Sequence, residues 1–466
     1  MSTTEQNPLF ILADWISAIQ SNWSDQSLLT AQNCFVDTVG CMVPGSREEV
    51  TERILPVASR WGIGKCSLVG SPQGLSAPMA ALVNGTAAHA LDFDDDFDPG
   101  KCHPSAAIIP ALLAKAEEMD KTGLDLLDAY IVALEVTGRV GQALNPFHRR
   151  RGWHATATIG TIGATAGLCR LMELNSEATR HALSACTSMA AGFMSQFGSM
   201  IKPMHAGLAA MRAVMAAELA EAGITAGAHS FDGPYSLRTL MVGLDVDELA
   251  EEMKSKDEYG QKSMFLLDDL GAPLIIDEFG VKVKRFPNCG SVHRALDNLL
   301  DLMKAHNFSA QSVENIHVRA PVAHLKNIPY DTPKTPLEAK FSLPYGLAVG
   351  LNSGHIGLDD FKETALNRPE ILKLYSLISY EGVNELESDF PTETSVKLKD
   401  GRELVKSRYH AVGSKAYPLK TEEIWKKFYS NTNSFRIHND ITTFLSKMTT
   451  GPSCRRFMHA LKNISS

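Results

Sequence analysis

The stretch that decides the fold runs from Ala155 to Leu168 and reads ATATIGTIGATAGL. It contains no charged residue, and its alanine, glycine and threonine side chains are small enough to let neighbouring helices approach closely. It is too short to span a bilayer, which takes about 20 apolar residues. We therefore interpret it as a buried helix inside a helical bundle.

Helical periodicity extends on both sides of this stretch. Apolar residues recur at three- and four-residue spacing through most of the chain before residue 265. Ser24 and Asn175 each stand where a helix-capping residue is expected. Alanine and glycine are dense between residues 77 and 228, which is typical of the interior of a large bundle. The expected helices cover 9–19, 28–43, 78–91, 106–118, 124–140, 158–172 and 204–221.

The pattern changes after Gly271. Residues 270–415 mix short apolar alternations with helical spacing and predict a compact α+β domain. Its clearest signal is a hairpin turning at Asp400-Gly401, because this dipeptide suits a tight primed turn. Helical periodicity returns from Leu419. Within the α+β region we expect strands at 275–286 and 313–318 and helices at 296–303 and 337–349.

Composition excludes several classes of protein. A chain of 466 residues is too long for one hydrophobic core and predicts two or three domains. The formal net charge of −8 argues against a nucleic-acid-binding protein, which carries a basic surface. An anionic small-molecule substrate stays possible, because a local basic pocket can lie within an acidic protein.

The cysteines and the N-terminus predict a soluble cytoplasmic protein with no membrane partner. The eight cysteines are scattered and contain no C-x-x-C pair, so they predict neither a disulfide framework nor a zinc site. The first 20 residues lack the basic, apolar and cleavage regions of a signal peptide.

The segment from Asn84 to Pro110 holds five carboxylates close together: Asp92, Asp94, Asp95, Asp96 and Asp98. They cannot all be buried without cations or raised pKa values, so a solvated acidic turn is the plain alternative. Three of them also fit the D-D-x-x-D pattern with which helical isoprenoid synthases hold magnesium. Such enzymes need a second acidic motif, and the nearest candidate, residues 268–269, lacks the third acid.

Basic residues cluster in three further segments. An arginine run at 149–151 precedes Trp153-His154 at an expected helix start, where an anion can bind. Lys202 stands just before a helix begun by Pro203. The third segment, residues 282–294, runs from a basic strand into a helix and makes a plausible carboxylate clamp.

Taken together, these segments resemble the MmgE/PrpD family, whose members include 2-methylcitrate dehydratase, cis-aconitate decarboxylase and iminodisuccinate epimerase. The resemblance spans most of the chain and depends on the order of several motifs. These are NGTAAHALDFDD (84–95), HPS (103–105), GWHATATIG (152–160), KPMHAG (202–207), KRFPNCGSVH (284–293) and EAKFSLPY (338–345).

The resemblance implies a mainly α fold in which a large helical bundle domain is discontinuous in sequence. Residues 1–268 would form its first part, 269–415 a smaller inserted α+β domain, and 416–466 helices that return to the bundle. It also implies a homodimer, an active site between the two domains, no cofactor and no obligatory metal.

The resemblance also implies the chemistry, which is the removal of a proton next to a carboxylate in a small di- or tricarboxylic acid. Lysines would neutralise the anionic substrate, and a second group would exchange a proton. The family's active-site positions correspond here to Asp92, His103, His154, Lys202 and Lys284. We expect the histidines to act as acid and base and the lysines to bind carboxylates. Further candidates for substrate binding are Asp96, His205, Arg285, Cys289 and His293.

Three departures leave the substrate open. The decarboxylase carries histidine where this chain has Cys289, and its tyrosine before the EAK motif has no clean counterpart, since Tyr330 falls later. Asp96 replaces a small hydroxyl residue. We therefore expect a dehydratase-like or decarboxylase-like lyase, with an epimerase or isomerase of an iminodisuccinate-like acid as the alternative. A magnesium-dependent isoprenoid synthase and a non-catalytic helical binding protein are the more distant alternatives.

Overall fold

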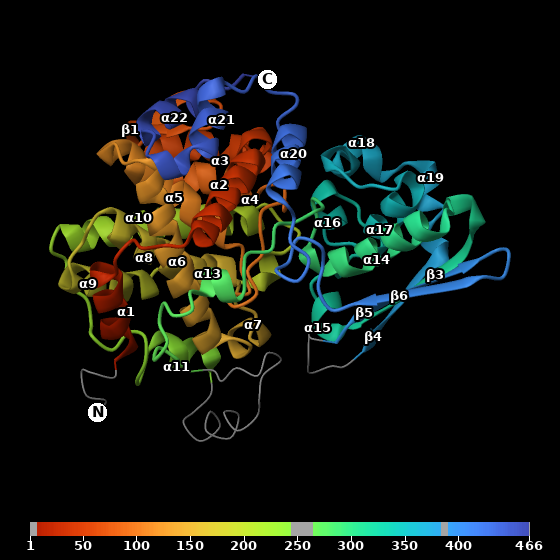
Figure 1. Cartoon of the computed structure of the whole chain (residues 1–466), viewed down its shortest axis with the longest axis horizontal. Helices are drawn as coiled ribbons and strands as arrows, with labels where there is room; N and C mark the ends of the chain where they lie inside the picture. The colour runs from red at the N-terminus through yellow and green to blue at the C-terminus, as the bar shows by residue number, and fades with distance from the viewer. Residues whose placement is uncertain (1–6, 244–263, 384–389, 466) are drawn as a thin grey trace.

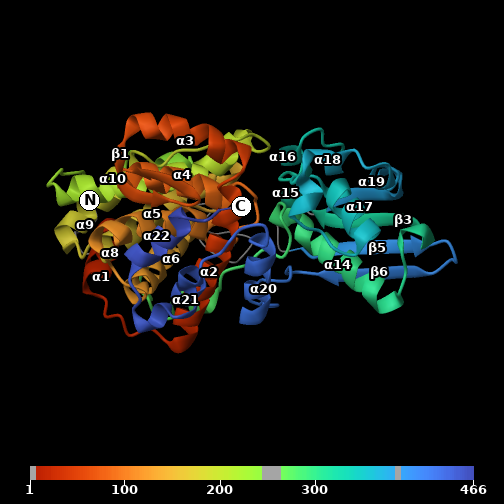
Figure 2. The same cartoon turned by 90° about the horizontal axis from the view of Figure 1, so that it is seen from above.

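The fold is mainly helical, as the sequence predicts (Figure 1). A computed structural model describes residues 7–243, 264–383 and 390–465. In these ranges the chain forms a large helical body and, beside it, a smaller body in which helices pack on a sheet (Figures 1 and 2). Among the helices described, none combines the length and apolar composition that a bilayer span requires.

Each body has its own hydrophobic core. The larger core draws on residues from Leu9 to Val283 and, after a long interval, on the C-terminal helices from Ile424 onward. The smaller core lies between Phe286 and Leu404. We propose that the domains divide at 1–268, 269–415 and 416–466. Because Val283 packs in the larger core, the chain passes from the larger body to the smaller one close to Lys284.

The larger body begins with helices that match the seven expected segments. Every residue of α8 from Ala155 to Cys169 is buried, in keeping with its small, uncharged side chains. Its elements are α1 (Pro8–Ala18), α2 (Asp25–Gly45), α3 (Glu49–Trp61), β1 (Ile63–Leu68), β2 (Ser71–Leu75), α4 (Ala77–His89), α5 (Pro104–Met119), α6 (Gly123–Leu144), α7 (Phe147–Arg150), α8 (Ala155–Leu171), α9 (Ser176–Thr187), α10 (Ile201–Glu221), α11 (Leu237–Val242), α13 (Ile275–Glu278), α20 (Thr421–Asn431), α21 (Asn439–Ser446) and α22 (Cys454–Lys462).

Side chains at the ends of these helices fix where they begin. Ser24 accepts a hydrogen bond from the backbone of Ser27 at the start of α2, and Asn175 does the same at the start of α9. The antiparallel pair β1–β2 was not expected from the sequence. It is anchored by Glu117, whose carboxylate accepts hydrogen bonds from the backbone and hydroxyl of Ser67.

The smaller body is a four-stranded sheet with helices packed against it (Figure 2). The strand order is β4-β3-β5-β6, with β3 and β4 parallel and the other neighbours antiparallel. The predicted hairpin at Asp400-Gly401 is confirmed as the turn between β5 and β6. The elements are α14 (Gly290–His306), β3 (Val313–Pro321), α15 (Val322–Leu325), α16 (Pro336–Ala339), α17 (Leu343–Ser353), α18 (Glu363–Leu366), α19 (Pro369–Leu372), β4 (Ile378–Val383), β5 (Thr392–Leu398) and β6 (Glu403–Arg408).

Two sequence-based expectations in this region are wrong. Residues 275–286 do not form a strand. They begin as the short helix α13, whose first N–H group, on Ile275, is held by Glu135 of α6, and then continue toward the smaller body without regular structure apart from one bridge at Lys282. Residues 337–349 are not one helix. The chain breaks between α16 and α17 because Ser342 caps a new helix that has a proline in its first turn.

Candidate active site

Helices α4 and α10 pack so closely that only glycine fits at their crossing. A Cβ atom on Gly207 would lie 2.1 Å from the carbonyl oxygen of Leu82, and one on Gly85 would lie 2.8 Å from Cα of Gly207. Small residues at a helix crossing shorten the distance between the axes. This contact brings the first turn of α10, with Lys202 and His205, against the C-terminal end of α4.

The loop between α4 and α5 brings the acidic run to the same place. Asp92 adopts a φ of 51°, in the left-handed region that residues other than glycine rarely occupy. Such a conformation persists only where surrounding contacts hold it, and it is common at functional sites. In this loop the contacts are made by lysine side chains.

The Asp92 carboxylate binds two ammonium groups through one oxygen. Its Oδ1 lies 2.8 Å from Nζ of Lys202 and 3.0 Å from Nζ of Lys284. The Lys284 ammonium also donates to the backbone carbonyl of Asp92. All three side chains are at most 5% exposed, and Oδ2 of Asp92 has no hydrogen-bond partner among the described residues. The trio therefore buries two positive charges against one negative charge.

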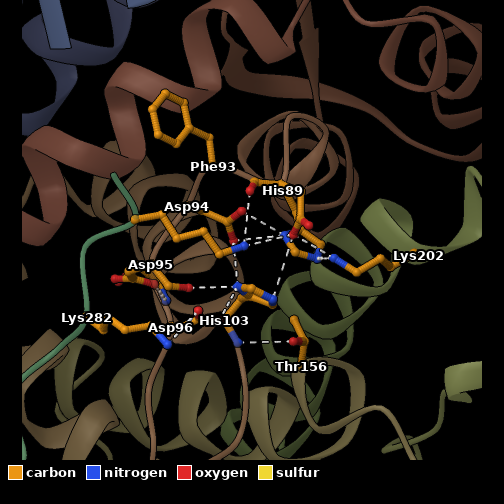
Figure 3. Close-up of polar contacts among 12 residues, drawn as sticks. His89, Phe93, Asp94, Asp95, Asp96, His103, Thr156, Lys202 and Lys282 are labelled. Carbon is orange, nitrogen blue, oxygen red and sulfur yellow. Dashed lines mark hydrogen bonds and ion pairs between the residues drawn. The ribbon is translucent and has the colours of Figure 1, made fainter. Parts of the chain in front are cut away.

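His89 and Asp94 extend this cluster, and His89 was not among the residues expected at the site (Figure 3). The Asp94 oxygens lie 2.9 and 2.8 Å from Nδ1 of His89, and Nε2 of His89 lies 3.0 Å from Nζ of Lys202. Because a carboxylate only accepts and an ammonium only donates, the imidazole is neutral and carries its proton on Nδ1. The available signal was the position of His89, three residues before Asp92 at the end of α4.

His103 presents the lone pair of a ring nitrogen beside the lysines. Its Nδ1 lies 2.7 Å from the carbonyl oxygen of Asp95, so Nδ1 donates and Nε2 carries the lone pair. This Nε2 lies 3.9 Å from Oδ1 of Asp92. The side chain of His103 is 13% exposed, more than those of Asp92, Lys202 and Lys284. It is therefore the most accessible of these four side chains.

His154 and His205 form a second histidine pair at the edge of the cluster. Their Nδ1 atoms lie 2.8 Å apart, so one ring donates and the other accepts. The His154 ring centroid lies 6.4 Å from that of His89 and 5.0 Å from that of Phe197. The structure therefore brings His154 to the same region as His103 but gives it a different hydrogen-bond partner.

Two of the predicted substrate-binding residues lie beside the cluster. Asp96 pairs with Lys282 at 3.0 Å, and the two residues also exchange backbone hydrogen bonds (Figure 3). Cys289 stands at the start of α14, and its backbone N–H donates to Lys340. Burial raises the pKa of the Cys289 thiol, and the negative charge of Asp92 raises it further. This side chain is therefore a neutral neighbour of the lysines.

The other two belong mainly to the smaller body. Arg285 turns to Asp297, with 2.9 Å between Nη1 and Oδ1, and its side chain is 40% exposed. His293 is fully buried, and its Nε2 lies 3.3 Å from the carbonyl oxygen of Asn288. Neither arrangement brings the side chain onto Asp92 or its two lysines.

The smaller body also contributes two residues of the EAKFSLPY motif (338–345). The break between α16 and α17 directs the buried side chains of Lys340 and Phe341 toward the cluster. Nζ of Lys340 donates to the carbonyl oxygen of Ala90 at 3.1 Å, and the Phe341 ring lies 5.1 Å from Nζ of Lys202. The cluster therefore lies where the two bodies meet.

The charged groups of the cluster stabilise one another. Burial alone would raise the pKa of Asp92, but the ammonium groups of Lys202 and Lys284 hold it well below its usual value. Burial alone would lower the pKa of Lys284, but the charge of Asp92 raises it. Asp92 and Lys284 therefore stay ionised at neutral pH.

The histidines are neutral in the same environment. Burial, reinforced by the charge of Lys284, lowers the pKa of His103 to about 3. Burial is the main cause that lowers the pKa of His154 well below its usual value, and the positive charge of Lys202 lowers it further. Burial raises the pKa of Asp95 to about 8, so this carboxyl group is protonated where it meets Ser105. Neutral imidazoles beside fixed ammonium groups can accept protons from an anionic ligand.

A divalent cation fits this cluster poorly. One ligand atom each from His89, Asp92, Asp94 and His103 lies within 4.8 Å of the others, which is close enough for a metal. However, two ammonium groups already occupy Oδ1 of Asp92, and one of them also contacts His89. Because these positive charges would repel a cation at the same position, lysine takes the place that a metal would hold.

The D-D-x-x-D interpretation fails for a related reason. Asp94 faces His89, Asp95 is hydrogen-bonded to Ser105, and Asp98 is exposed. The three carboxylates therefore do not converge on one ion, and the isoprenoid-synthase alternative is wrong for this site.

The fold and the site agree with the family that the sequence resembles. The model of the MmgE/PrpD N-terminal domain matches residues 11–248, and that of the MmgE/PrpD C-terminal domain matches residues 286–441. The chain belongs to the MmgE/PrpD family.

Its relatives include cis-aconitate decarboxylases. The human enzyme is 28% identical over 88% of this chain and 84% of its own length. The mouse enzyme is 26% identical over 91% of this chain and 86% of its own length. A cis-aconitate decarboxylase-like protein, oryM, of Aspergillus oryzae is 25% identical over 80% of this chain and 79% of its own length. These names support an enzyme of the lyase class.

The buried neutral state of His103 makes a prediction about pH. The folded-state pKa, about 3, lies below the unfolded value of about 6.5. The stability that comes from keeping this ring neutral is fully present above pH ~6.5 and is lost as the pH falls toward 3. At pH 5 the loss amounts to roughly 2 kcal/mol. Lowering the pH from 7 to 5 should therefore reduce the free energy of unfolding less in His103→Gln than in the unaltered chain. Urea unfolding at the two pH values measures this difference.

The matched control is His355→Gln, at an exposed position in the smaller body. This variant should follow the unaltered chain. Equal acid sensitivity in His103→Gln would show that His103 titrates normally and would contradict the neutral, buried assignment.

Proposed function

We propose that this chain is a cofactor-independent lyase that acts on a small di- or tricarboxylic acid by proton abstraction next to a carboxylate. One observation carries the proposal: two buried ammonium groups from distant segments, Lys202 and Lys284, share one oxygen of Asp92 beside neutral imidazoles. A non-catalytic helical binding protein gives no reason for this convergence.

The lysines supply the electrostatic part of the mechanism. A substrate carboxylate would take hydrogen bonds from Lys202 and Lys284, which are held in place before it arrives. When the neighbouring C–H bond breaks, its electron pair moves toward that carboxylate and builds a second negative charge there. Fixed ammonium groups in a site with little water stabilise this charge strongly, because they need no reorganisation.

The histidines supply the proton transfer. Nε2 of His103 is the proposed base, because its other nitrogen is committed to the carbonyl oxygen of Asp95. His154, held by His205, is the proposed second acid or base. In a dehydration the proton that is taken from carbon would leave with the departing hydroxide as water. In a decarboxylation the C–C bond breaks, CO₂ leaves, and the electron pair left on carbon takes up a proton that a histidine has received from solvent.

Asp92 would hold the two lysines rather than charge a histidine, since its oxygen contacts both ammonium groups. Cys289 and His205 are the candidates for substrate binding that lie nearest to this arrangement. Asp96 would act through Lys282, while Arg285 and His293 would contribute only indirectly. These roles follow from the contacts described above and are part of the proposal.

The relatives favour cis-aconitate as the first substrate to test. A 2-methylcitrate-like acid comes next, because dehydration requires the same groups. Cys289 supports the alternative of an epimerase acting on an iminodisuccinate-like acid, since a thiol stands where the decarboxylase has histidine. An epimerase would use His103 and His154 as bases on opposite faces, without a leaving group.

Proton NMR in D₂O would test the proposal and separate these alternatives. The chain should be incubated separately with cis-aconitate, 2-methylcitrate, citrate and iminodisuccinate. Loss of CO₂ or water is the expected result for a lyase. Deuterium uptake next to a carboxylate with the carbon skeleton retained would identify an epimerase. No change in any of the four compounds would refute the proposed chemistry.

Variants and a chelator complete that experiment. His103→Gln and Lys202→Gln should each lower kcat/KM by about 100-fold or more, the scale of one lost acid–base or charge-stabilising group. The matched control is His355→Gln, which is remote from the cluster. Activity should persist in EDTA, and a loss that added magnesium reverses would restore a metal to the mechanism.

We further propose that the chain forms a cytoplasmic homodimer. All eight cysteines are free, as in a reducing compartment. An apolar seam along α10 supports the dimer. In this seam large apolar side chains recur at three- and four-residue spacing, so they lie on one face of the helix. Three of its members, Ile201, Met215 and Leu219, are 37–39% exposed, and the other three pack partly against the core of the same chain. Exposed apolar side chains in one row favour a face that another chain covers. The α10 seam consists of Ile201, Met204, Leu208, Met211, Met215 and Leu219.

Sedimentation equilibrium tests the dimer. The unaltered chain should sediment as a dimer, and the double variant Met215→Glu/Leu219→Glu as a monomer, because charges on the seam oppose its burial. Leu240→Glu, at an exposed position on α11 outside the seam, is the matched control and should stay dimeric. A monomeric unaltered chain, or a dimeric seam variant, would contradict the assignment.

A further inference from the structure

A third buried lysine lies directly behind the cluster. Lys427 of α20 is 8% exposed, and its Nζ lies 2.6 Å from Oδ1 of Asp37, a fully buried carboxylate on α2. The same Nζ donates to the carbonyl oxygens of Phe93, at 2.7 Å, and Lys284, at 3.0 Å. The Phe93 ring stacks over this ammonium, with 3.9 Å from Nζ to the centroid.

The two carbonyl groups belong to the segments that carry the central ion pair. Phe93 directly follows Asp92, and the second carbonyl is that of Lys284 itself. The side chains of Asp92 and Lys284 form the ion pair itself, in which Nζ of Lys284 lies 3.0 Å from Oδ1 of Asp92. One ammonium group therefore ties the acidic loop to the segment that crosses between the bodies.

The position of α20 explains why such a tie is needed. The chain leaves the larger body near Lys284, builds the smaller body, and returns to pack α20 against α2 (Figure 1). Lys284 lies outside the helices and strands of the described chain. The backbone N–H groups before it, on Lys282 and Val283, donate to Asp96 and Gly413, and the carbonyl group of Lys284 itself is held by Lys427.

We propose that Lys427 is a positioning residue of the active site, which acts through the backbone of Phe93 and Lys284 to hold Asp92 and Lys284 together. Asp37 supports it by supplying the buried counter-charge. The inference depends on the proposed function for its kinetic consequence, but its geometric consequence is independent of any substrate. It also means that the site is complete only after residues 421–431 have packed on α2.

A double-mutant cycle on activity tests this role, with cis-aconitate as the substrate. Lys427→Met should lower kcat/KM by about 100-fold, the cost of a displacement near 1 Å. In a Lys284→Gln background the same substitution should change kcat/KM within about twofold, because the group that it positions is already absent. Lys427→Arg should recover part of the activity. An equal factor in both backgrounds would identify a general effect on stability and overturn the proposal.

Lys115→Met is the matched control for the loss of a buried lysine. Lys115 of α5 is 10% exposed at its side chain and pairs with Glu118 and Glu218, remote from the cluster. Lys115→Met should lower the melting temperature and leave kcat/KM unchanged. A fall in its kcat/KM matching that of Lys427→Met would overturn the specific role.

The crystal structure of Lys427→Met provides a measurement that needs no turnover. Separation of the Lys284 ammonium from Asp92 is the expected result. If the 3.0 Å contact is retained, the positioning role is wrong. If the unaltered chain converts none of the four compounds while the contact is lost in the variant, the proposed function fails and the positioning role stands.

Discussion

The sharing of one Asp92 oxygen by Lys202 and Lys284 is the interaction on which the rest of the structure depends. Removing an ion from water costs several kcal/mol, and the attraction between partners offsets this only when the geometry is good. Here the geometry requires a left-handed backbone at Asp92 and the close packing of α4 on α10 at glycine. It also requires that Lys427 hold the segment that carries Lys284. Each of these features has a physical reason once the ion trio is in place.

The discontinuous chain serves the same arrangement. The acidic loop and α10 belong to the larger body, Lys284 lies on the crossing segment, and Lys340 with Phe341 comes from the smaller body. A site built at such a junction can exclude water, which strengthens its electrostatic interactions. It also couples the chemistry to the packing of the C-terminal helices, because α20 carries Lys427 to the cluster.

Much of this could be predicted from the sequence. The small, uncharged residues of α8 predicted a buried helix, and the order of motifs brought Asp92, His103, Lys202 and Lys284 together as candidates. The role of His89 could not be predicted in the same way, because a histidine at the end of a helix has many possible partners.

Other features depend on tertiary contacts that no local pattern encodes. Apolar alternation at 275–286 indicated a strand, but a carboxylate from α6 starts a short helix there instead. The basic segment 282–294 predicts that Arg285 is part of a carboxylate clamp, whereas its guanidinium pairs with Asp297. Lys427 lies in an ordinary amphipathic helix, and only the return of the chain reveals its position behind Lys284.

The most direct test of the account is a crystal structure with tricarballylate, a saturated tricarboxylate that has neither a hydroxyl group to lose nor a double bond. The account predicts that one carboxylate accepts hydrogen bonds from the ammonium groups of both Lys202 and Lys284, with Nε2 of His103 facing the adjacent carbon. Binding at any other place, with both lysines still confined to Asp92, would contradict it.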